Sequence, residues 1–160
     1  MAVDMFIKIG DIEGESTDDK HGKEIDVLAW SWGMSQSGTT HMGGGGGSGT
    51  VSVQDLSFTK YVDAATHALM KACCDGTHYT EAKLVVRKAG KEALEYIKAT
   101  FKEVIVTSVS TGGSGGEDRL TENVTLNFAE FKLEYTPQKD DGSGDSAKEF
   151  GWNIAAKKAA

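Results

Sequence analysis

The sequence predicts a mainly β protein, a closed barrel or sandwich of two β-sheets with one short flanking α-helix. Two-residue alternation of apolar and polar side chains recurs along most of the chain, and only one segment has helical spacing. Glycine-rich loops separate the alternating runs, with 20 glycines against one proline. The 160 residues fit one domain, residues 1–160, which is long enough to bury a core without a metal or disulfide.

Two strands are expected near the N-terminus. Residues 3–9 alternate so that one face is wholly apolar. Residues 25–34 place Leu28, Trp30 and Trp32 on one face, which we expect to pack. The opposite, solvated face of that strand carries small or polar residues, namely Val27, Ala29, Ser31 and Gly33.

A third strand and the helix follow. Residues 51–58 change phase near Gln54, which is typical of a β-bulge. Residues 63–75 then predict a short amphipathic helix, capped by Asp63 and stopped by Gly76. Its buried face is expected to hold the residues at helical spacing: Ala65, Leu69, Ala72 and Cys73.

The second half of the chain alternates again, over residues 82–87, 94–109, 119–135 and 150–154. The run at 119–135 changes phase near Ala129, where a bulge would keep both of its halves on the core. Along 94–109, the core side is expected to carry Ile97, Ala99, Phe101, Ile105 and Val109. About seven strands result, and so little proline leaves sheet edges open to other copies of the chain.

Charge and composition exclude several classes of function. The net charge of −7 argues against nucleic-acid binding, and no apolar run is long enough to insert into a membrane. The N-terminus lacks a basic, apolar leader, so any export is expected without a cleaved signal peptide. Cys73 and Cys74 are adjacent and unsuited to a disulfide with each other. We expect two reduced thiols, one packed and one partly exposed.

Catalytic and cofactor motifs are missing. Neither Gly-rich loop supplies the lysine and helix of a phosphate loop, and the sequence has no GxSxG, HExxH or CxxC. The four histidines lack metal-site spacing and are expected at the surface. We therefore expect no catalytic residue, no metal, no cofactor and no enzyme activity. An alternative is a lectin-like β-sandwich that binds sugars through Trp30 or Trp152.

Several segments, distributed from one end of the chain to the other, are similar to those of a known family. The sequence resembles the Hcp (haemolysin-coregulated protein) family of bacterial type VI secretion. The matching segments are Met5–Ser16, Ile25–Gly38, His41–Gly49, Val51–Asp63, Ser110–Ala129 and Phe150–Ile154.

The resemblance implies a fold similar to that of phage tail-tube proteins. It implies homohexameric rings that stack into the inner tube of a contractile injection machine, within a sheath and behind a spike of valine-glycine repeat protein. Members also carry small effector proteins in the lumen and pass from the bacterial cytoplasm to the exterior. On this basis Ser31 and Ser114 are expected to face the lumen. The ring-stacking loop is expected to be Gly43, Gly44, Gly45, Gly46 and Gly47.

Overall fold

The computed structural model describes residues 3–38, 48–90 and 93–160, which form eleven strands and one helix. Several runs that the sequence suggested as single strands are divided in two. The elements are β1 (Val3–Ile9), β2 (Ile25–Ser31), β3 (Met34–Gly38), β4 (Ser48–Val53), β5 (Leu56–Tyr61), α1 (Thr66–Asp75), β6 (His78–Lys88), β7 (Glu95–Thr111), β8 (Thr121–Asn127), β9 (Glu130–Tyr135), β10 (Lys148–Asn153) and β11 (Lys158–Ala159).

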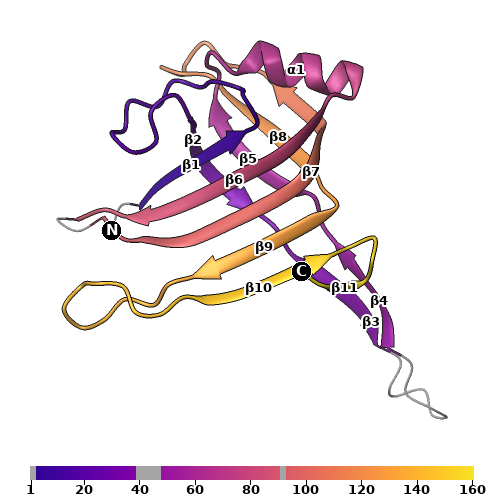
Figure 1. The fold of residues 1–160 in the computed structure, drawn as a ribbon. Coiled ribbons are helices and arrows are strands. Elements are labelled where there is room, and N and C mark those ends of the chain that lie inside the picture. The colour runs from indigo at the N-terminus through magenta and orange to yellow at the C-terminus, as the bar shows by residue number, and fades with distance from the viewer. Residues whose placement is uncertain (1–2, 39–47, 91–92) are drawn as a thin grey trace.

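Six antiparallel strands close into a barrel in the order β7-β6-β1-β2-β5-β8, with β8 paired back onto β7 (Figure 1). The 17-residue β7 permits this closure, because its first half pairs with β9 and its second half with β8. Strands β9, β10 and β11 continue the sheet beyond the barrel. The expected mainly β barrel with one flanking helix is confirmed.

Strands β3 and β4 form a separate two-stranded sheet, which we call the arm. The arm projects away from the barrel, and α1 lies at the other end of the molecule (Figure 1). The phase change expected near Gln54 is therefore larger than a bulge. It is the point where the chain leaves the arm and enters the barrel as β5.

A β-bulge in β2 changes which of its side chains face the core. The register against β5 shifts between Val27 and Ala29, so Val27 is buried and Leu28 is exposed, opposite to the expectation. Beyond the bulge, Trp30 and Trp32 do pack against the core as expected. Ser31 lies on the opposite, exposed side.

A similar phase change divides β7. Phe101 is buried, Glu103 has a positive φ of 54°, and the buried positions then continue at Val104 and Val106. Ile105, expected in the core, is only half-buried. This change of phase lies where β7 stops pairing with β9 and begins to pair with β8.

The helix begins at Thr66, later than expected, because Asp63 caps the preceding turn by accepting the N–H of Ala65 at 2.9 Å. Gly76 ends it in the left-handed conformation, as the sequence predicted. Leu69 and Ala72 are buried. Cys73 and Cys74 are both exposed, so the expectation that one of them packs is wrong.

Candidate functional site

Small polar side chains form two rows across four neighbouring strands on the outside of the barrel wall. In one row Ser31 is opposite Ser57, which is followed by Thr125 and then Ser108. The next row runs from Ala29 through residues on β5, β8 and β7. We define the polar face by the seven polar members of the two rows: Ser31, Ser57, Thr59, Ser108, Ser110, Asn123 and Thr125.

The polar face exists because each of its strands alternates. The residues between its members, Trp30, Phe58, Val124 and Val109, pack into or against the core. Its own side chains are exposed or half-buried, and none carries a charge. The two rows therefore form a neutral surface of hydroxyl and amide groups, bordered near Thr107 by the Asp55 carboxylate.

Hydrogen bonds order part of this face. The hydroxyl of Thr59 donates to Asn123 Oδ1 at 2.7 Å, and the hydroxyls of Thr107 and Thr125 lie 2.7 Å apart. Ser31 borders a shallow hollow of about 220 Å³ together with Ser57 and other residues of β2, β5 and β8. Among the residues that the structure describes, none of these hydroxyls is hydrogen-bonded to a histidine.

Ser114 does not join Ser31 on the polar face. It lies in the exposed loop between β7 and β8, beyond the end of the barrel where Tyr61 pairs with Thr121. Its carbonyl accepts the N–H of Glu117 at 3.1 Å, which closes a turn. Sequence reasoning grouped the two serines, and the structure separates them along the strand direction.

The expected stacking loop, Gly43–Gly47, lies outside the described residues. Its stem is the arm, whose base borders an apolar groove of about 180 Å³. Met34 of the arm is 45% exposed and Phe150 of β10 is 52% exposed, both high values for large apolar side chains. We define the apolar groove by its lining residues: Met34, Gln36, Val51, Val53, Phe131, Phe150 and Trp152.

The tryptophans of the lectin-like alternative pack against the core, and Trp30 also lines the hollow beside Ser31. Trp30 and Trp152 are half-buried. Trp32 contacts the Phe131 ring edge-on, with centroids 4.8 Å apart. Trp152 also lines the apolar groove, and its indole N–H is buried without a hydrogen-bond partner among the described residues.

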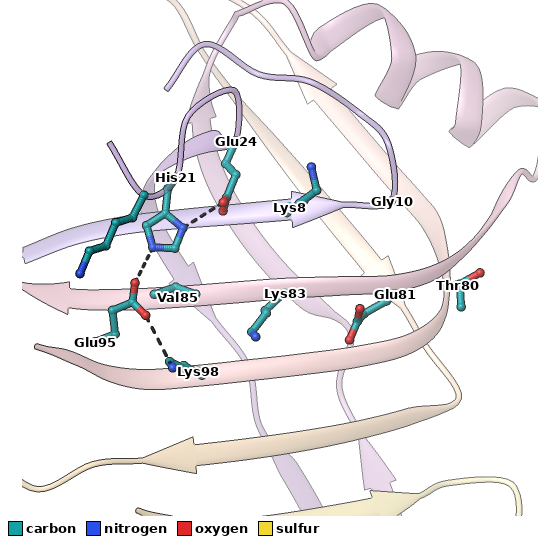
Figure 2. A pocket seen from close by; sticks show the side chains of 11 residues that line it. Lys8, Gly10, His21, Glu24, Thr80, Glu81, Lys83, Val85, Glu95 and Lys98 are labelled. Atoms are coloured by element: carbon teal, nitrogen blue, oxygen red, sulfur yellow. Dashed lines mark hydrogen bonds and ion pairs between the residues drawn. The ribbon is translucent and has the colours of Figure 1, made fainter. Parts of the chain in front are cut away.

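Sequence reasoning missed a cluster around His21 on the other side of the barrel. His21 was expected at the surface but is buried, with Nδ1 2.9 Å from Glu24 Oε2 and Nε2 2.6 Å from Glu95 Oε1 (Figure 2). Burial alone would lower the pKa of His21, but the hydrogen bonds to Glu95 and Glu24 outweigh it and raise that pKa above its ordinary value. Burial would likewise raise the pKa of Glu95, and His21 lowers it overall.

His21 and Glu24 belong to the loop of residues 10–24. A second contact also holds this loop onto the barrel. Arg87 of β6 forms a two-pronged ion pair with Asp18, at 3.0 and 2.6 Å. Arg87 holds the pKa of Asp18 well below its ordinary value. Phe6 stacks on His21 with centroids 4.7 Å apart, and it is buried although it alternates with Asp4 and Lys8. That apolar side chain on a polar face was the sequence signal for a covering loop.

Lys60 and Glu122 form another unexpected cluster, at the end of the barrel near α1. Both side chains are buried, and they are ion-paired to each other. Lys60 Nζ also lies 2.9 Å from Asp63 Oδ1, and the Thr66 hydroxyl donates to Glu122 Oε2 at 2.8 Å. The strand phase contained the signal, because Lys60 continues the core positions of Leu56 and Phe58.

Within the described ranges, no group of three or more histidine, cysteine or acidic side chains could hold a metal ion. The two nitrogens of His21 face different carboxylates, which does not make a chelating set. No helix of the described chain is both long and apolar enough to cross a membrane.

Comparison with known proteins gives consistent matches. The sequence profile of the family described as "Type VI secretion system effector, Hcp" matches residues 6–135. The chain is 68% identical to Protein hcp1 of Pseudomonas aeruginosa over 156 residues, 96% of each chain.

Solved structures agree in fold. One described as the structure of a type six secretion system protein has a TM-score of 0.94 at 31% identity, covering 99% of this chain and all of that one. Hcp1 from Salmonella typhimurium has a TM-score of 0.81 at 40% identity, covering both chains completely.

Proposed function

The chain belongs to the Hcp family of type VI secretion system proteins, and from this premise we propose that it forms hexameric rings whose lumen is lined by the polar face. The single observation that carries the proposal is the register of this face, which brings Ser31, Ser57, Thr125 and Ser108 into one row across four strands. A neutral hydroxyl wall suits a conduit, because it holds a passing protein through weak, water-mediated hydrogen bonds.

Self-association is supported by the apolar groove and by open strand edges. Met34 and Phe150 expose large apolar side chains on neighbouring elements, and a second copy of this chain would remove them from water. On β10, the described C-terminal residues cover only Gly151, Trp152 and Asn153, which leaves the beginning of β10 open on that side.

In the proposed assembly the rings stack through the arm and its Gly43–Gly47 tip to form the inner tube. A contractile sheath surrounds the tube, a valine-glycine repeat spike precedes it, and small effector proteins travel in the lumen. The chain has a structural and carrier role in this scheme, not an enzymatic one. It passes from the bacterial cytoplasm to the exterior when the machine fires.

Light scattering coupled to size exclusion at micromolar concentration tests the ring. We expect a mass near six times the 17.0 kDa of one chain, with a central hole in electron micrographs of the same peak. A 17.0 kDa species at every concentration would contradict unaided assembly. A labelled effector should co-elute with the ring, and its elution apart from an intact ring would contradict the carrier role alone.

A further inference from the structure

A groove of about 480 Å³ lies on the barrel wall opposite the polar face. It is lined by residues of β1, β6, the start of β7 and the loop 10–24 (Figure 2). In the closed order β7-β6-β1-β2-β5-β8, strands β6 and β1 are diametrically opposed to β5 and β8. If the polar face lines the lumen, this groove therefore opens on the outside of the ring.

Four lysines line this groove, which we call the lysine groove: Lys8, Lys20, Lys83 and Lys98. Lys8 and Lys83 are direct cross-strand partners, and Figure 2 shows their side chains pointing apart. Like charges at directly opposed positions destabilise a sheet. The four lysines lie together at one site, although the net charge of the chain is −7.

Three carboxylates, those of Glu24, Glu81 and Glu95, also line the lysine groove. Glu24 and Glu95 hold His21, and Glu95 also pairs with Lys98 at 3.6 Å. Among the described residues, no carboxylate lies within ion-pair distance of Lys8, Lys20 or Lys83. Glu81, at one end of the groove, has the same charge as an acidic ligand and would repel it there.

The walls of the lysine groove are held in place before any partner arrives. His21 bridges the loop to β7 through Glu95, and Asp18 fixes the same loop to Arg87 of β6. Gly10, at the mouth of the loop, has a φ of +53°, and a Cβ there would lie 2.5 Å from the Tyr79 ring. A preformed groove loses little conformational entropy on binding.

We propose that the lysine groove binds an acidic peptide segment of a partner protein at the outside of the ring. This inference rests on the proposed function for the groove's outward position, and on charge complementarity for the partner's chemistry. Lys8, Lys20 and Lys83 provide the unpaired cations, and carboxylates of the acidic segment would relieve their mutual repulsion. Such a contact is salt-sensitive and reversible.

Fluorescence anisotropy with a labelled poly-L-glutamate peptide of about ten residues tests the proposal on the full chain. We expect saturable binding that weakens about tenfold in the Lys8→Glu/Lys83→Glu variant. The matched control is Lys157→Glu/Lys158→Glu, which makes the same charge change at exposed positions outside the groove. This control should bind within about twofold of the unmodified chain.

Three outcomes overturn the proposal: no peptide binding, equal loss in both variants, or displacement of the peptide by inorganic phosphate well beyond that by chloride at equal ionic strength. The last result would assign the groove to small anions. Light scattering separates this test from that of the proposed function, since the groove variant should retain the ring mass. If charge reversal prevents folding, Lys8→Gln/Lys83→Gln replaces it, with the same expected order of affinities.

Discussion

Lys60 of β5 and Glu122 of β8 are directly opposed across adjacent strands, and both side chains are excluded from solvent and paired. Asp63 makes a second contact with Lys60, and Thr66 at the start of α1 binds Glu122. One cation thus holds two carboxylates where two barrel strands meet the helix. Removing that cation leaves buried negative charges uncompensated, which is more destabilising than the loss of any surface pair.

We therefore expect Lys60→Met to lower the free energy of unfolding by about 3 kcal/mol or more. Adding Glu122→Gln to Lys60→Met should restore about 1 kcal/mol, because one uncompensated charge is then removed. Urea unfolding at fixed protein concentration measures both changes. The control is Lys71→Met, which breaks the exposed Lys71–Asp75 pair and should change stability by less than about 0.5 kcal/mol. Equal effects of Lys60→Met and Lys71→Met would contradict this account.

The His21 cluster predicts a dependence of stability on pH. Because the pKa of His21 is raised in the folded chain, its contribution is fully present below the unfolded pKa of about 6.5 and is lost as pH rises through the folded value. The pKa of Glu95 is lowered, so Glu95 affects stability in a different pH range. Its contribution to stability is lost only as pH falls through the acidic range.

His21→Gln should therefore remove about 1 kcal/mol more stability at pH near 6 than at pH near 8. Urea unfolding at the two pH values measures this difference. The exposed His67 provides the comparison, because His67→Gln makes the same exchange at a surface position outside the loop 10–24. A His21→Gln profile parallel to that of the unmodified chain would show that the imidazolium does not stabilise the loop 10–24.

Alternation predicted a closed barrel or sandwich and the phase changes near Gln54 and Ala129, but not the irregularities elsewhere in the strands. Val27 and Glu103 lie at irregularities that transfer burial to the opposite face, and bulges carry little composition signal when no glycine or proline marks them. Lys60 shows the same limit for polar residues. Its core-facing phase is visible in the sequence, yet its ion-pair partner lies 62 residues away on a strand whose pairing the sequence does not state.

The candidate site was predictable in part. Ser31 was correctly expected on the exposed side of β2, because the two neighbouring tryptophans required the opposite side. Its cross-strand neighbours depend on register, which local sequence does not determine when several strands have similar patterns. His21 lies in a loop without periodicity, so only tertiary structure could bring it to Glu95 of β7.

The apolar groove leads to a prediction about assembly. Phe150→Ser should raise the concentration needed for ring formation by about tenfold or more, because the apolar area at the proposed contact is lost. Met70→Ser is the control, as Met70 is 36% exposed on α1, away from the groove. Light scattering over a dilution series measures both. Rings of Phe150→Ser that persist to the same dilution as those of Met70→Ser would exclude the groove from the interface.

The Gly43–Gly47 segment is predicted to act between rings and not within them. Replacing residues 39–47, which include it, by a two-residue Asn-Gly turn between the paired Gly38 and Ser48 should close the arm as a short hairpin and leave the barrel unaffected. The ring mass should stay constant in light scattering, while the stacked tubes seen by negative-stain microscopy become shorter or disappear. Tubes of unchanged length would mean that stacking uses other surfaces.

Ser31 provides the most direct test of which wall faces the lumen. Ser31→Gln places a longer side chain on the exposed side of β2, beside Ser57, without disturbing the core on the opposite side. We expect rings of normal mass that retain labelled effector about tenfold less well, since six copies of a larger group would project into one channel. The matched control is Ser146→Gln, at an exposed position in the loop between β9 and β10. If Ser31→Gln and Ser146→Gln rings retain the effector equally, the polar face does not contact the cargo, and the lumen must be lined by another wall of the barrel.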